Sequence, residues 1–237
     1  MRIPLEKRLR KRAHIRLGYL QDELVEILYS ISGRFVLHGG TAIWRCHSGL
    51  RFSEDLDFYA EKLPGDFEER LREAMGARGL EIRKFKTTEN LIFCKVASPE
   101  AEARIEINFS RKVKAIPVQF ERMDGSSMIV LGLRLTDLIL EKAAAYISRK
   151  LVRDVYDVYF LASKLGESEG SGMESSNLIG KHGQPRDEST AKAIKELSKL
   201  VEKFWQPRDE GTLKAIIFSG AIPTFGQMME YLRGRFP

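Results

Sequence analysis

The sequence predicts an α/β (α+β) protein, in which a sheet-forming part is followed by a mostly helical C-terminal part. Two observations indicate this. Short runs of alternating apolar and polar residues, separated by turn residues, fill the stretch 80–131. Apolar residues at helical spacing precede that stretch and return from residue 133 onward. We therefore expect two parts, residues 1–132 and residues 133–237.

The composition is typical of a globular protein. Of the 237 residues, 43% are hydrophobic and 30% are charged, which is enough to bury a core. No apolar run approaches the length of a membrane span, and the basic N-terminus lacks the apolar segment of a signal peptide. Cys46 and Cys94 stand outside any metal-ligand spacing. We expect a cytoplasmic protein with reduced thiols and no membrane partner.

Basic residues concentrate at the N-terminus. Residues 1–16 carry seven Lys or Arg and one Glu, a local charge of +6 that equals the formal charge of the whole chain. Such a segment binds nucleic-acid phosphates, or it forms the solvated face of a helix, and both interpretations stay open. Apolar residues at helical spacing then predict an amphipathic helix ending near Gly33: Leu17, Leu20, Leu24, Ile27, Leu28 and Ile31.

A pair of glycines follows this helix. The short apolar run 35–37 stops just before Gly39 and Gly40, which predicts a buried strand entering a tight turn. A helix is then expected to start at Thr41. Paired glycines before a helix N-terminus let backbone N–H groups approach an anion closely, and the helix dipole adds to the attraction. A Gly-Gly pair alone is more often only a turn.

Asp55 and Asp57 supply a second signal. If they lie in a strand, both carboxylates point to one side, while Leu56 and Phe58 point to the other. Two like charges at that spacing repel each other unless a cation lies between them, and carboxylate oxygens suit Mg²⁺. An Asp-x-Asp alone is more often solvated surface. A phosphate-binding turn followed by paired carboxylates is the combination that transfer of a nucleotidyl group requires.

These two motifs resemble a known family. Gly-Gly-Thr-Ala at 39–42, followed by Arg-Phe-Ser-Glu-Asp-Leu-Asp-Phe at 51–58, resembles the AbiEii/AbiGii-type nucleotidyltransferase toxins, a branch of the DNA polymerase β-like superfamily. The resemblance covers about residues 30–165 and implies a mixed-sheet nucleotidyltransferase core. It extends to a basic and acidic group further along the chain: Lys142, Arg149, Arg153, Asp154 and Asp157.

Five strands are expected after a helix at 66–78, and they cover 80–85, 91–97, 103–109, 116–120 and 128–131. In the third of these, Ile105, Ile107 and Phe109 alternate with Arg104, Glu106 and Asn108. In the superfamily, a carboxylate on a later strand helps to hold the second metal and to activate the attacking hydroxyl. Glu106 fits that role if its strand neighbours the Asp pair. Glu102 competes for it, and ordinary solvent-face polarity is the alternative.

A helix is predicted over 133–150. If it continues unbroken, Lys142, Arg149 and Arg153 share one face, with Asp157 nearby. The resemblance favours Lys142 as a ligand of the triphosphate that stabilises the leaving pyrophosphate. The two arginines either hold phosphate or RNA, or pair with Asp154 or Asp157 and fasten two helices together.

The C-terminal third lies outside the resemblance. The stretch 166–183 is rich in Gly, Ser and Glu, and it predicts a flexible linker or long loop. Beyond it, the segment 184–194 is echoed by 206–216 at nine of eleven positions. Each copy begins Gln-Pro-Arg-Asp-Glu and predicts the start of a short helix, and we assign the repeat no function.

The reaction implied is Mg²⁺-dependent transfer of a nucleoside monophosphate from an NTP to an acceptor hydroxyl, with two metal ions and release of pyrophosphate. The resemblance implies a toxin with a cognate antitoxin, and tRNA as the acceptor. Transfer to a protein or small molecule, or a non-catalytic nucleic-acid-binding module, are the alternatives. The expected site residues are Asp55, Asp57 and Glu106 for metal binding and catalysis, Lys142 for catalysis and nucleotide binding, and Gly39, Gly40, Thr41, Arg51, Ser53 and Asp157 for nucleotide binding.

Overall fold

The computed structural model describes residues 3–165 and 188–236. The chain forms two compact units, Met1–Leu133 and Arg134–Pro237. Each unit has its own buried core. Within the described residues, no helix has both the length and the apolar character needed to cross a membrane.

The first unit is built on a seven-stranded sheet with the order β3-β4-β5-β2-β1-β7-β6. The sheet is mixed, because β1 pairs in parallel with β7 and β2 pairs in parallel with β5, whereas the other neighbours are antiparallel. This confirms the predicted fold class. The strands are β1 (Val36–His38), β2 (Leu56–Tyr59), β3 (Glu81–Thr87), β4 (Leu91–Ala97), β5 (Glu102–Asn108), β6 (Ala115–Glu121) and β7 (Ser127–Leu133).

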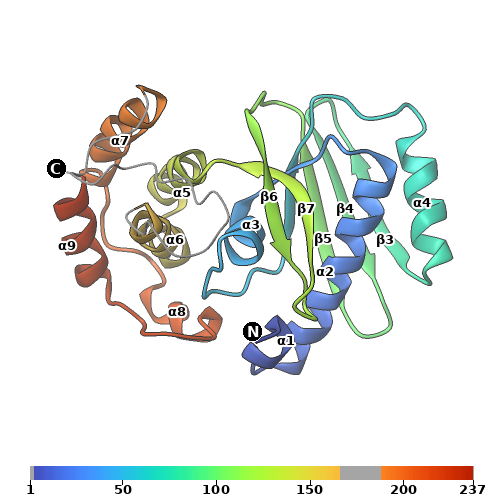
Figure 1. The fold of residues 1–237 in the computed structure, drawn as a ribbon, viewed down its shortest axis with the longest axis horizontal. Coiled ribbons are helices and arrows are strands. Elements are labelled where there is room, and N and C mark those ends of the chain that lie inside the picture. The colour runs from blue at the N-terminus through green and yellow to red at the C-terminus, as the bar shows by residue number, and fades with distance from the viewer. Residues whose placement is uncertain (1–2, 166–187, 237) are drawn as a thin grey trace. The chain divides into compact units, whose positions relative to one another are not determined.

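Helices cover the two faces of this sheet differently. The amphipathic helix α2 (Arg12–Ile31) and α4 (Phe67–Ala77) lie on one side, and α3 (Gly39–Cys46) lies on the other, against β1, β2 and β6 (Figure 1). The predicted alternation in β5 is confirmed, since Ile105 and Ile107 are buried while Glu106 is half-buried. Asp57 of β2 and Glu106 of β5, on the other face from this core, are therefore partly exposed to solvent.

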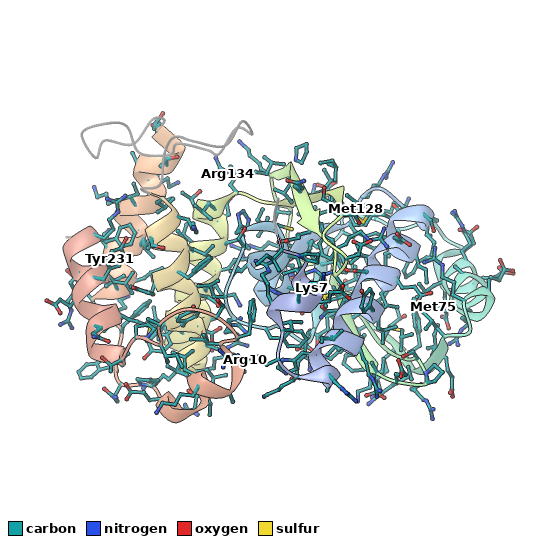
Figure 2. All side chains as sticks on the ribbon, turned by 60° about the horizontal axis from the view of Figure 1, so that its bottom comes forward. Lys7, Arg10, Met75, Met128, Arg134 and Tyr231 are labelled. Atoms are coloured by element: carbon teal, nitrogen blue, oxygen red, sulfur yellow. The ribbon has the colours of Figure 1, made fainter. Side chains whose placement is uncertain are left out.

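The basic N-terminal segment is folded onto the first unit. Its short helix α1 (Leu5–Arg8) buries Leu5 completely. Arg8 contacts Glu121 at 2.9 Å, so part of the positive charge is neutralised. Lys7 and Arg10, which are labelled in Figure 2, are exposed side chains of this segment. The segment is therefore a packed element with a basic outer surface.

The second unit is helical. It contains α5 (Leu135–Arg149), α6 (Val152–Lys164), α7 (Glu188–Val201), a short 3-10 turn (Glu210–Thr212), α8 (Leu213–Ile216) and α9 (Phe225–Arg235). The assumption of an unbroken helix past residue 150 is wrong. Lys150 adopts a left-handed conformation with φ of 55° and ends α5, and α6 starts two residues later.

The second copy of the repeat supports this break. Asp209 accepts a hydrogen bond from the backbone N–H of Val152 at 2.7 Å, which caps the first turn of α6. The backbone N–H of Arg208 donates to the carbonyl of Lys150 at 2.9 Å. The two copies do not form equal helices, because the second copy contains only the 3-10 turn and α8. The predicted flexible stretch 166–183 and the start of the first copy lie outside the described residues.

Candidate active site

The two glycines allow an unusually close approach between β1, α3 and the following loop. Gly39 has a φ of +72°, a conformation that L side chains rarely adopt, and a Cβ there would collide with the carboxylate of Asp57. A Cβ on Gly40 would collide with Oγ of Ser53 and lie 2.7 Å from Nη2 of Arg51. Close packing therefore requires glycine at both positions. The two glycines let the N-terminus of α3 lie against Ser53, Arg51 and Asp57.

Hydrogen bonds fix the loop that carries Ser53 and Asp55. The hydroxyl of the buried Thr41 donates to the carbonyl of Asp55 at 2.5 Å. Nε2 of Gln21 donates to the carbonyls of Ser53 and Glu54, each at 2.9 Å. Sequence reasoning missed Gln21, because its burial and its two carbonyl partners, 32 and 33 positions away, are visible only in the structure.

The same loop rests on aromatic side chains. Phe52 is buried, lies 4.6 Å from Trp44 between ring centroids, and stacks on His14 of α2 at 3.9 Å. Burial, reinforced by the charge of Lys11 and partly opposed by Glu54, lowers the pKa of His14 below its ordinary value of 6.5. A neutral imidazole therefore packs beneath the loop.

The carboxylates meet through strand pairing. Asp57 of β2 lies directly opposite Glu106 of the parallel neighbour β5, so both side chains point to the same side. Asp55 comes one residue before β2 and lies in the loop, which corrects the expectation that it belongs to the strand. Glu102 lies at the other end of β5 and pairs with Lys95 at 2.9 Å. The register brings Glu106, and not Glu102, beside Asp57.

Arg104 joins this group, and sequence reasoning missed its role. Its Nη2 lies 2.5 Å from Oδ2 of Asp55, and its Nε lies 3.3 Å from Oε1 of Glu106. One guanidinium therefore supplies the positive charge that two neighbouring carboxylates require. The sequence shows that Arg104 and Glu106 share the polar face of one strand, but it gives no sign of the contact with Asp55, which lies 49 positions away.

Oxygen donors from Asp55, Asp57 and Glu106 fit the chemistry of a hard divalent cation such as Mg²⁺. Within residues 3–165 and 188–236, no three His, Cys, Asp or Glu side chains are grouped closely enough to form a ready metal site. Asp55 and Glu106 instead each contact Arg104. The donor types fit the ion, while the side-chain arrangement is that of a charge-paired form.

Lys142 and Asp157 belong to the second unit and contact each other across α5 and α6. Nζ of Lys142 lies 3.1 Å from Oδ2 of Asp157 and 3.8 Å from Oδ1 of Asp154. Arg149 makes two hydrogen bonds to Asp154, both at 2.6 Å. Of the two interpretations of Arg149, the structure shows the one in which it pairs with Asp154 and fastens two helices together. Arg153 is exposed.

Solved structures with a similar fold are known. Over 95% of this chain and 90% of the other, the fold is similar to that of JHP933 from Helicobacter pylori, with a TM-score of 0.62 and 20% sequence identity. The nucleotidyltransferase toxin MenT4 from Mycobacterium tuberculosis is similar over 96% of this chain and 84% of its own, with a TM-score of 0.58 and 20% identity. At these identities, the likeness shows a shared fold.

No curated protein matches this chain. The family described as nucleotidyl transferase AbiEii toxin, of type IV toxin–antitoxin systems, matches residues 26–230. That match spans both units and most of the chain, and it includes the glycine turn, the carboxylates and the Lys142 network. The protein is a nucleotidyltransferase that belongs to the AbiEii toxin family.

Proposed function

We propose that this protein transfers a nucleoside monophosphate from an NTP to a hydroxyl group of tRNA in a reaction that depends on Mg²⁺. The observation that carries the proposal is the contact between the glycine turn and Asp57, because it sets an anion-binding helix N-terminus beside carboxylates that suit a cation. A nucleoside triphosphate with its metal needs both at once. The AbiEii family supports the nucleotide substrate and a cognate antitoxin as partner.

The glycine turn is the proposed phosphate site. Backbone N–H groups at the start of α3 are the proposed donors, and the lack of side chains at Gly39 and Gly40 lets neighbouring polar side chains approach them closely. Ser53 and Arg51 lie against Gly40, so a hydroxyl and a guanidinium are available at the same place. Thr41 acts indirectly in this proposal, because its hydroxyl holds the backbone of Asp55.

Asp55, Asp57 and Glu106 are the proposed metal-binding residues. When bound, the metal would neutralise charge on the phosphates and align the attacking hydroxyl. Glu106 lies opposite Asp57 and is half-exposed, so it is the proposed acceptor of the proton from that hydroxyl. Arg104 holds Asp55 and Glu106 in place in the charge-paired arrangement.

Lys142 and Asp157 stay nucleotide-binding candidates because they match the family motif. Their ion pair is almost fully buried, with side-chain exposures of 9% and 2%. The match to the family motif is the ground for assigning Lys142 to the leaving pyrophosphate, whose negative charge a lysine can stabilise. The proposed role is therefore charge stabilisation by a lysine that Asp157 orients.

The acceptor and the nucleotide are tested together. The protein is incubated with Mg²⁺, total tRNA and each of the α-labelled NTPs in turn. We expect label to enter tRNA from one or more NTPs, and to remain after the protein is digested. Label that appears only in protein or in small molecules would overturn the tRNA assignment. NTP and tRNA are cytoplasmic, so the proposed reaction belongs to that compartment.

A further inference from the structure

The carboxylates continue into an unusual row of side chains across the sheet. Strand pairing sets Asp57 opposite Glu106, Glu106 opposite Phe93, and Phe93 opposite Lys86. Residues directly opposite each other in a sheet point to the same side. One face of β2, β5, β4 and the edge strand β3 therefore carries, in order, two carboxylates, an aromatic ring and an ammonium group.

An open recess of about 300 Å³ lies at the β3 end of this row, lined by Lys84, Lys86, Thr88, Leu91 and Phe93. Nζ of Lys84 lies 5.4 Å from the centroid of the Phe93 ring. Both lysines are exposed, and Phe93 is half-buried. The recess thus combines an accessible aromatic face with two cationic groups.

The opposite face of the same strands is core. Ile92, Cys94 and Val96 alternate with Phe93 along β4 and are buried on the side that α2 and α4 cover (Figure 1). An apolar ring was not needed at Phe93 to fill that core. Lys95, which shares the face of Phe93, pairs with Glu102 at 2.9 Å, whereas Lys84 and Lys86 line the recess beside the ring.

An aromatic ring with flanking lysines on an open sheet face is suited to single-stranded nucleic acid, because bases stack on the ring and phosphates meet the cations. We propose that Phe93, Lys84 and Lys86 bind the single-stranded end of the RNA acceptor. The inference rests on the proposed function, since it takes RNA as the acceptor. Phe93 and Glu106 are directly opposite on neighbouring strands, which are roughly 5 Å apart. A base stacked on Phe93 would therefore lie close to Glu106, within about the length of one nucleotide.

Binding is measured by fluorescence anisotropy with the full chain and a short labelled single-stranded RNA of mixed sequence. Phe93→Leu keeps apolar volume but removes stacking, so we expect affinity to fall about 5- to 150-fold. Phe93→Trp keeps a ring and should bind within about threefold of the unchanged protein. A blunt RNA duplex, which offers no unstacked base, should show no such difference between the two variants.

The lysines are tested through salt dependence. For single strands, each phosphate contact contributes about 0.7 to the slope of log affinity against log salt, so Lys84→Gln with Lys86→Gln should lower the slope by about 1.4. Lys192→Gln with Lys195→Gln on α7 removes the same charge from exposed positions of the second unit and is the matched control. Melting curves establish that every variant is folded.

Each outcome decides a separate question. Unchanged affinity in Phe93→Leu, or an equal loss of slope in the α7 control, overturns this RNA site while leaving the transfer reaction intact. A protein that transfers label to tRNA with the same KM for tRNA in Phe93→Leu also overturns the site. No binding of any RNA, together with label transfer to a non-RNA acceptor, overturns both this site and the tRNA assignment.

Discussion

Two regions of the molecule pair acidic and basic side chains, and they do so in physically different ways. In the first unit, Asp55 and Glu106 share Arg104, and all three side chains are between 33% and 42% exposed. In the second unit, Asp154 is completely buried and holds Arg149 by two bonds. Exposed pairs exchange partners at little cost, whereas a buried carboxylate that loses its partner is strongly destabilising.

This difference in exposure suits the two regions to different roles. The carboxylates of the first unit are able to leave Arg104 for a metal ion, because water and salt already weaken that pair. The network of the second unit fastens α5 to α6 and fixes the position of Lys142. A spacing of acids and bases in the sequence therefore does not reveal by itself whether the group is exchangeable or fixed. Burial decides it.

The largest effect on stability is expected in the buried network. Arg149→Ala removes two hydrogen bonds from the completely buried carboxylate of Asp154, so the free energy of unfolding should fall by about 3 kcal/mol. Chemical denaturation measures this. Asp137→Ala is the control, because its pair with Arg134 is about one-third exposed and should cost less than about 1 kcal/mol. Equal losses in the two variants would remove the distinction between buried and exposed pairs.

A smaller loss of stability is expected from a substitution in the glycine turn. Gly39→Ala places a Cβ in a left-handed conformation and against Asp57, so it should cost about 1–3 kcal/mol and also weaken nucleotidyl transfer. Gly76→Ala in α4 meets no atom within 4 Å and should stabilise the protein slightly. Melting temperature and transfer rate are measured for both. A Gly39→Ala enzyme with normal transfer would contradict the close packing of the turn on Asp57.

Arg104 tests whether the carboxylates of the first unit are exchangeable. Arg104→Gln removes an exposed cation, so stability should fall by less than about 1 kcal/mol, while the affinity for Mn²⁺ alone should rise because Asp55 and Glu106 lose their competing partner. Calorimetric titration with Mn²⁺ in the absence of NTP measures this. Arg72→Gln breaks an exposed pair with Glu68 in the same unit and should leave Mn²⁺ affinity unchanged. Weaker Mn²⁺ binding in Arg104→Gln would show that the arginine supports the metal site.

The smallest effect concerns pH. Because the pKa of His14 is lowered in the folded protein, the unfolded chain binds more protons as the pH falls below 6.5. The contribution of His14 to stability is therefore fully present above pH 6.5 and is lost as the pH falls toward its lowered pKa. His14→Phe keeps the stacking on Phe52 and should flatten the stability profile in that window. An identical profile in the variant would show that other groups set the pH dependence.

Much of the fold could be predicted from local patterns. The strand predicted at 91–97 has the same limits as β4, and the alternation around Ile105 predicts which face of β5 is core. The periodicity of apolar residues indicates which face of a helix or strand is buried, and a stretch of a few residues is enough to show it. The parallel pairing of β2 with β5 was not accessible in this way, because it joins residues about fifty positions apart.

The errors have physical causes as well. Lys150 ends α5 without a glycine or proline, and its carbonyl is held by Arg208 from a distant segment, so no local signal marks the break. The role of Arg104 is hidden in the sequence because its partner Asp55 lies 49 positions away, in the loop before another strand. Gln21 satisfies backbone carbonyls that the sequence does not display. Each missed feature is a contact between distant segments.

The carboxylates beside the glycine turn are the groups to which we assign the transfer reaction. Asp57→Asn tests this most directly, since Asp57 lies opposite Glu106 and against Gly39, whereas Arg104 contacts Asp55 and Glu106. We predict that transfer from an α-labelled NTP falls by at least about 10³-fold and that Mg²⁺ no longer raises the melting temperature. Asp66→Asn, at an exposed helix start, should behave as the unchanged protein. An Asp57→Asn protein that transfers nucleotide within about tenfold of the normal rate would contradict this assignment.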